Sequence, residues 1–357
     1  MSASPSFRAS RLALVLPFIG LAIVFAALSV YWLVVRNGVE TAFTDWRASQ
    51  ARLGATVTCG EERFAGYPFR IEVVCRDAVL ETGDAPAIRA QLGSLVAVAQ
   101  VYNLRHIILE ANGPFALEGA APDGALGAPL GPGLGPIQLD WDTARASLRF
   151  QIEDDLATLE RGSLVLETLR GTALVAGAQQ TFGAARTEVH ILQKSDASVT
   201  RLAYDLALRA QDAAGGVVEP NTALWQGAMD AVAFDLPPFA TDMGTFLRTW
   251  AVQDGSLGVT RLEITNGTQT MTGSGTLKAA IDGRLQGDLS VGLGGIESSG
   301  GDDAALPAIL APLAIVLSFI GTPVTINEAP GRQIDLSIRD GVVSAGLYPV
   351  VTIPPLF

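Results

Sequence analysis

The chain has 357 residues, a formal net charge of −12 and only 17% charged residues, whereas soluble domains carry about 25%. The acidic balance argues against nucleic-acid binding, which requires clustered Lys and Arg side chains. The two histidines and two cysteines are too few for a zinc-finger array or an iron–sulfur centre, and we expect no metal and no other cofactor.

The N-terminal region predicts a membrane anchor. Residues 12–35 carry no charge and reach about 36 Å as a helix, enough to cross a hydrocarbon core of about 30 Å. Arg8 and Arg11 precede this segment, which places the tail 1–11 in the cytoplasm. A cleaved signal peptide is the alternative, but its apolar region usually has about 7–15 residues. We therefore expect a single-pass anchor in a bacterial inner membrane, with residues 36–357 in the periplasm.

Helical spacing continues beyond the charge-free segment. Tyr31 and Trp32 lie near its far end, where amphipathic rings favour the membrane interface. The apolar positions that follow are Val39, Ala42, Phe43, Trp46 and Leu53. Their spacing predicts an amphipathic helix that packs on the folded domain, with the membrane surface as the alternative.

Most of the remaining chain alternates apolar and polar residues with period two. The clearest runs are 69–74, 148–153, 204–209, 285–293 and 334–339. Such alternation is typical of antiparallel sheets that have one buried and one solvated face. Asp-Gly and Asn-Gly pairs, which favour tight turns, separate several of the runs. We expect a mostly β (α+β) protein: a large antiparallel sheet with a few packed helices.

Three segments interrupt the strand pattern. Residues 239–251 carry one apolar stripe and predict a helix. Residues 304–321 are apolar throughout and predict a buried or groove-capping helix, with membrane contact as the alternative. Residues 113–136, rich in Gly, Pro and Ala, show no period and predict a long loop. This loop divides an N-terminal β subdomain (36–112) from a C-terminal β-rich subdomain (137–357).

The two cysteines lie close together in the sequence. If Val57–Cys59 and Phe69–Cys75 pair as antiparallel strands, the thiols of Cys59 and Cys75 come within reach of a disulfide. An exported compartment and an even cysteine count favour that bond. Two buried free thiols are the alternative.

The sequence offers no recognisable catalytic constellation. It contains no G-x-S-x-G, H-E-x-x-H or G-x-x-x-x-G-K-[ST] motif. His106 and His190 lie in ordinary strand patterns, and the pair Asp140 and Asp142 fits a solvated strand end better than a calcium site. We expect a protein that is not an enzyme.

A motif between the cysteines carries a family resemblance. The anchor, the Trp46 helix and the segment Gly66-Tyr67-Pro68-Phe69-Arg70 resemble a proteobacterial family of membrane-anchored proteins, domain of unknown function 2125. The glycine-punctuated hairpins at 275–293 and 331–347 are similar to those of AsmA-type envelope proteins. This second likeness implies an inner-membrane anchor carrying a curved sheet whose apolar inner face holds or guides lipid acyl chains.

Two functions fit these observations. The first is binding of phospholipid or another hydrophobic ligand in envelope maintenance, with the segment 304–321 as a lid. The groove-lining residues would be Leu285, Leu289, Val291, Leu293, Ile334, Leu336 and Ile338. Within the motif, Tyr67, Pro68, Phe69 and Arg70 form either a structural turn or an aromatic lip on that groove. The alternative function is a non-enzymatic scaffold or assembly factor that binds envelope proteins through edge strands.

Overall fold

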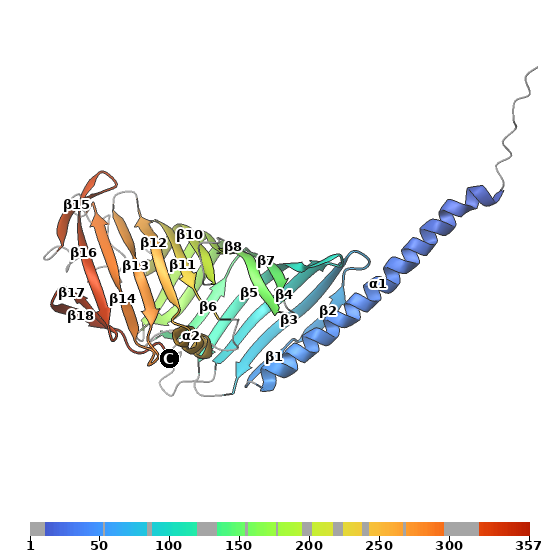
Figure 1. Ribbon diagram of the computed structural model, residues 1–357, viewed down its shortest axis with the longest axis horizontal. Coiled ribbons are helices and arrows are strands. Elements are labelled where there is room, and N and C mark those ends of the chain that lie inside the picture. The colour runs from blue at the N-terminus through green and yellow to red at the C-terminus, as the bar shows by residue number, and fades with distance from the viewer. Residues whose placement is uncertain are drawn as a thin grey trace, which may run out of the picture.

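A computed structural model shows a long helix followed by one large antiparallel sheet (Figure 1). The structure describes residues 11–52, 54–83, 88–119, 134–153, 156–175, 178–194, 202–216, 224–237, 243–266, 269–295 and 321–357. Its two helices are α1 (Arg11–Arg52) and α2 (Met243–Val252). The predicted mostly β class with a few helices is confirmed, and α2 confirms the helix expected at 239–251.

The strands follow one another along the chain, and α2 lies between β11 and β12. Their bounds are β1 (Ala55–Thr58), β2 (Glu61–Ala65), β3 (Arg70–Thr82), β4 (Ile88–Gln100), β5 (Asn103–Gly119), β6 (Leu134–Asp140), β7 (Thr143–Glu153), β8 (Leu156–Val175), β9 (Ala178–Gln193), β10 (Ala203–Gly216), β11 (Trp225–Phe234), β12 (Ser256–Thr265), β13 (Thr270–Ala279), β14 (Leu285–Gly294), β15 (Thr322–Ile326), β16 (Ala329–Arg339), β17 (Val342–Ala345) and β18 (Tyr348–Thr352).

Strands that are consecutive in the sequence are mostly neighbours in the sheet. β1 and β2 both pair with β3 at one edge, and β6 and β7 share the place between β5 and β8. The order then runs from β8 to β14 and on to β16, which pairs with both β15 and β17. β18 follows β17. Every pair is antiparallel, and the sheet forms one long curved layer between α1 and β18 (Figure 1).

A single helix contains the predicted anchor and the predicted amphipathic segment as far as Arg52; Leu53 lies outside the described residues. α1 is continuous for 42 residues, about 63 Å at 1.5 Å per residue. Within the described residues it is the one helix long and apolar enough to cross a membrane. Its exposed large apolar side chains are Val15, Leu16, Phe18, Ile19, Leu21, Ile23, Val24, Phe25, Val30, Tyr31, Leu33, Val34 and Trp46. The C-terminal part of α1 runs beside β1 and β2, while its N-terminal part extends beyond the sheet (Figure 1).

Buried apolar side chains form clusters at the two ends of the sheet. The first cluster joins Trp32 of α1 to Ile71 and Val101. The second, which we call the C-terminal cluster, contains Met271, Leu293, Ile334, Leu336, Ile338, Val343 and Ala345. The first cluster fastens the helix to the sheet.

The segment predicted as a long loop contains more strand than expected. β5 continues to Gly119 and β6 begins at Leu134, so strand replaces loop at 113–119 and 134–136. Pro114 lies at a register shift between β4 and β5, where a residue without an N–H is tolerated. β5 also pairs with β7, so the two expected subdomains share one sheet. The apolar segment 304–320 and residues 120–133 lie outside the described residues.

The predicted disulfide is confirmed, but the strand pairing expected to produce it is wrong. Cys59 and Cys75 are bonded, with their Cα atoms 5.3 Å apart. β1 pairs with the far end of β3, where Val57 faces Leu80, and β2 pairs beside Cys75. The chain bends between β1 and β2, where the Gly60 N–H donates to the Arg76 carbonyl over 2.8 Å. That bend brings Cys59 beside Cys75.

Replacing both cysteines by serine tests the contribution of this bond. The bond closes a loop with a sequence separation of 16, which predicts a loss of about 3 kcal/mol in the free energy of unfolding. Urea unfolding of the full chain in mild detergent measures the loss. The wild-type chain treated with reductant is the control and should match the variant, whereas an unchanged midpoint in both would contradict the prediction.

Candidate functional site

The strand register aligns apolar residues into a continuous stripe across one face of the sheet. Residues that face each other on paired strands project to the same side. The central row of the stripe is Ile71, Ala99, Ile107, Leu148, Gly162, Ile191, Leu206, Ala231, Val259, Gly275, Leu289 and Leu336. A second row is Val73, Ala97, Leu109, Ala146, Leu164, Val189, Leu208, Met229, Leu262, Gly273, Val291 and Ile334. No charged residue interrupts either row, and we call the two together the apolar stripe.

The apolar stripe connects the two ends of the sheet. Ile71 belongs to the cluster around Trp32 of α1, and Leu336 belongs to the C-terminal cluster. At about 4.8 Å between neighbouring strands, the path between them is roughly 50 Å long. The stripe therefore begins beside the predicted membrane anchor and leads away from it.

The middle of the apolar stripe is only half-buried. Its large side chains on β5 to β10 all have intermediate or higher exposure: Ile107, Leu109, Leu148, Leu164, Val189, Ile191, Leu206 and Leu208. Val189 is the most open of these, at 37%. A one-sided sheet normally buries such a face under a second layer. Of the two described helices, α1 packs along β1 and α2 against β13, so neither is that layer for the central strands.

The charged side chains of the central strands occupy the opposite face. Glu110 pairs with Arg145 across β5 and β7 at 3.3 Å, and Arg209 pairs with Asp230 across β10 and β11 at 2.5 Å. A hydrogen bond with the Arg186 guanidinium lowers the pKa of the Glu188 carboxyl below its usual value, and a hydrogen bond with His190 lowers it to a smaller extent. These exposed and partly exposed pairs place the charged groups on the polar face, in contrast to the apolar stripe.

Both histidines are ordinary members of this polar face. His106 lies 2.8 Å from the Ser147 hydroxyl, and His190 lies 3.3 Å from a Glu188 carboxylate oxygen. They lie on β5 and β9. Within the described residues, no group of three or more His, Cys, Asp and Glu side chains could hold a metal ion.

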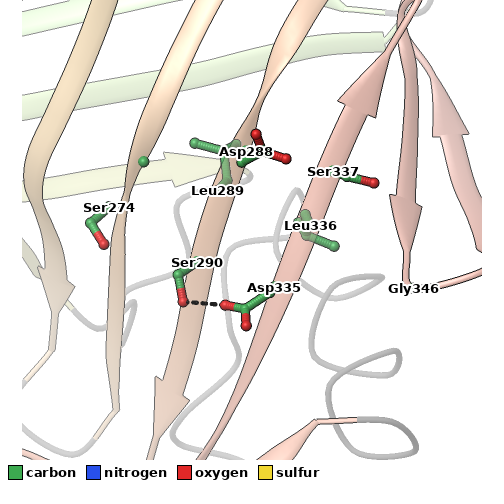
Figure 2. A pocket seen from close by; sticks show the side chains of 9 residues that line it. Ser274, Asp288, Leu289, Ser290, Asp335, Leu336, Ser337 and Gly346 are labelled. Carbon is green, nitrogen blue, oxygen red and sulfur yellow. Dashed lines mark hydrogen bonds between the residues drawn. The ribbon is translucent and has the colours of Figure 1, made fainter.

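A shallow pocket of about 400 Å³ lies over β13, β14 and β16 (Figure 2). Its lining residues include Ser274, Asp288, Leu289, Ser290, Asp335, Leu336 and Ser337. The Ser290 hydroxyl donates to Asp335 at 2.7 Å and accepts from the Gln333 amide at 2.8 Å. Ser290 is thus held from both sides by hydrogen bonds to side chains of β16.

The seven predicted groove-lining residues all lie in or against the C-terminal cluster. Four are buried, namely Leu293, Ile334, Leu336 and Ile338. The partly buried members are Leu285, Leu289 and Val291. The structure brings the seven together in a packed end of the apolar face, and their role as a groove lining stays a prediction. The more open section of that face lies on β5 to β10, where the sequence analysis named no site residue, although the alternation around Leu148 and Leu206 was visible.

The Gly66–Arg70 motif forms a turn that docks on α1. Gly66 has a φ of +99°, and a Cβ there would lie 2.6 Å from the Arg70 carbonyl oxygen, so only glycine fits. The Tyr67 ring packs edge-on against Trp32 at 5.4 Å and against Phe25 at 6.1 Å between ring centroids. Its hydroxyl lies 2.7 Å from the Ser29 hydroxyl. The motif therefore forms a structural turn, which is one of the two uses that its sequence suggested, and its use as a lip stays a prediction.

A second turn, between β4 and β5, docks beside the first. The Trp32 indole N–H donates to the Arg70 carbonyl at 2.8 Å, and the Tyr31 hydroxyl donates to the Val101 carbonyl at 3.0 Å. The Val101 N–H in turn donates to the Phe69 carbonyl at 3.1 Å. The two aromatic residues at the far end of the predicted anchor thus hold both turns. Sequence reasoning missed the second turn, because Val101 and Tyr102 carry no motif.

Truncating Trp32 tests this attachment. Trp32 is 8% exposed, and the change Trp32→Ala should cost roughly 3–5 kcal/mol through lost packing and an unpaired Arg70 carbonyl. Trp32→Phe retains most of the packing and should cost about 1 kcal/mol.

Melting of the full chain in mild detergent measures both changes. Trp46→Ala is the matched control, because Trp46 lies on the same helix and is 46% exposed. Equal losses of melting temperature in the Trp32→Ala and Trp46→Ala variants would show that Trp32 has no special part in the attachment.

These features define a β protein built on one open sheet, with an N-terminal helix that could span a membrane. The chain belongs to the bacterial family described as uncharacterized protein conserved in bacteria (DUF2125), whose model matches residues 32–354. The family resemblance carried by the Gly66–Arg70 motif is thereby confirmed. No curated protein and no solved structure matches the chain. The likeness to AsmA-type proteins stays a prediction.

Proposed function

We propose that α1 anchors this protein in a bacterial inner membrane and that its sheet, in the periplasm, binds lipid acyl chains or a similar hydrophobic ligand along the apolar stripe. The observation that carries the proposal is the uncharged, half-exposed stripe that starts beside α1. The function we propose is carriage or shielding of a hydrophobic molecule, without catalysis.

The continuity of the stripe is what favours a lipid. An acyl chain that leaves a bilayer exchanges one apolar environment for another, so it gains little by the move itself. Exposure to water on the way costs roughly 0.8 kcal/mol per methylene, and an unpaired charge on the path would also have to be desolvated. A path with no charge in either row avoids the second cost, and its apolar side chains reduce the first. A ligand that covers half-exposed leucines such as Leu148 and Leu164 removes apolar surface from water, which makes the free energy of binding more favourable.

A specific observation also favours the second candidate, a scaffold that binds proteins through an edge strand. All five residues of β18 are exposed, and Leu347 beside it is 97% exposed. In the described part of the chain β18 pairs with β17 and with no other strand. An edge of this kind offers unpaired backbone groups to an added strand.

Photo-crosslinking in living cells separates the two candidates. A benzophenone amino acid replaces Leu164 on the apolar stripe or Ser163, its neighbour on the polar face of the same strand. A third position, Val350, reports on the β18 edge. We expect lipid adducts at Leu164, identified by mass spectrometry, and few or none at Ser163.

Two outcomes would contradict lipid binding. One is equal lipid labelling at Leu164 and Ser163, which would reflect contact with bulk membrane. The other is an absence of lipid at Leu164 together with a discrete protein adduct at Val350, which would favour the scaffold.

A further inference from the structure

We propose that the two turns held by α1 insert into the membrane interface around that helix, so that the sheet itself touches the bilayer. Several apolar side chains in and beside these turns stay exposed although their backbone is held against α1. Tyr67 is 48%, Phe69 60%, Tyr102 72% and Leu104 43% exposed. We call these four residues the aromatic tip.

The contacts with α1 fix the level of the aromatic tip relative to the helix. Tyr31 and Trp32, whose ring types favour the membrane interface, bond directly to the backbone of both turns. The Tyr67 ring also reaches Phe25, which lies two helical turns, about 10 Å, closer to the N-terminus than Trp32. Phe25 belongs to the charge-free segment and is itself 53% exposed. In a bilayer that α1 crosses, the aromatic tip therefore lies at the depth of the C-terminal end of the charge-free segment 12–35.

Charged residues mark the expected boundary with water. Arg36, the first charged residue after the apolar segment, pairs with Glu40 at 3.1 Å. On the sheet, Arg70 and Arg105 are exposed and adjoin the aromatic tip in the sequence. Aromatic rings with arginines on the water side are typical of surfaces at a lipid headgroup region. On the helix and beside both turns alike, the aromatic residues come before the arginine in the sequence.

The lipid bilayer is the occupant favoured over a protein partner because the aromatic tip is continuous with the exposed apolar surface of α1. A soluble partner covering Tyr67 would also have to occupy the space beside Phe25, its ring neighbour on α1, which the acyl chains around a membrane helix fill. Insertion would place Ile71, the first residue of the apolar stripe, next to the membrane. The inference does not depend on whether the stripe carries lipid.

Spin labelling of the full chain in vesicles tests insertion. Both native cysteines are disulfide-bonded, so one introduced cysteine takes the nitroxide. The variants are Tyr102→Cys and Phe69→Cys on the aromatic tip, with Leu347→Cys, 97% exposed at the far edge of the sheet, as control. Vesicles of phosphatidylethanolamine and phosphatidylglycerol provide the bilayer. Power saturation then compares accessibility to oxygen, which partitions into lipid, with accessibility to a water-soluble nickel chelate.

We expect the ratio of oxygen to nickel accessibility to be several-fold higher at Tyr102 and Phe69 than at Leu347. Ratios equal to that of Leu347 would place the aromatic tip in water and overturn the proposal. Low accessibility to both reagents would mean that protein covers the tip, and would also overturn it. Circular dichroism confirms that each labelled variant keeps its sheet, and Leu104→Cys replaces Phe69→Cys if that variant loses it.

Discussion

One-sided alternation, held in register from β3 to β16, is the constraint on which the rest of the structure depends. Because side chains alternate along a strand, a slip of one residue between two strands would move a whole apolar set to the solvated face. The pairings keep Ile107 opposite Leu148 and Leu206 opposite Ile191, with charges such as Glu110 and Arg145 on the other side. The same register that stabilises the sheet therefore creates the apolar stripe.

The attachment to α1 gives this stripe a direction. Trp32 packs on Ile71 and Val101 and donates to the Arg70 carbonyl, so the start of the stripe is held against the helix. The disulfide between Cys59 and Cys75 fastens the edge strands within the same region. At the other end the stripe joins the packed C-terminal cluster. A hydrophobic ligand would thus have one end of its path beside the predicted anchor and the middle of the path half-open.

Much of the fold could be predicted from the sequence, because local patterns encode it. Period-two alternation and Asp-Gly turns predict antiparallel strands, and an uninterrupted apolar segment predicts the helix. Contacts between segments that are distant in the sequence were harder to predict. The disulfide was predicted from the cysteine count and spacing, but the bend at Gly60 that forms it depends on how β1 and β2 share β3. Strand at 113–119 was missed, because the register shift that accommodates Pro114 has no sequence pattern of its own.

The site was predictable only in part for the same reason. Leu289 and Leu336 were singled out by their alternation, yet the packing of the sheet decides that they lie at its buried end while Leu164 and Val189 stay half-exposed. The motif at Gly66–Arg70 was visible as a turn. Its contact with Trp32, and the neighbouring turn at Val101, depend on tertiary structure.

Native mass spectrometry of the full chain, released from mild detergent and followed by lipid extraction, tests the central claim most directly. Lipids that merely surround α1 would bind regardless of the sheet, so the comparison is between Leu164→Arg on the apolar stripe and Ser163→Arg on the polar face. The account predicts stoichiometric phospholipid or fatty acid on the wild-type chain, retained by Ser163→Arg and lost by Leu164→Arg. A wild-type chain that carries no lipid and takes up none when it is added would contradict it, as would equal retention by both variants.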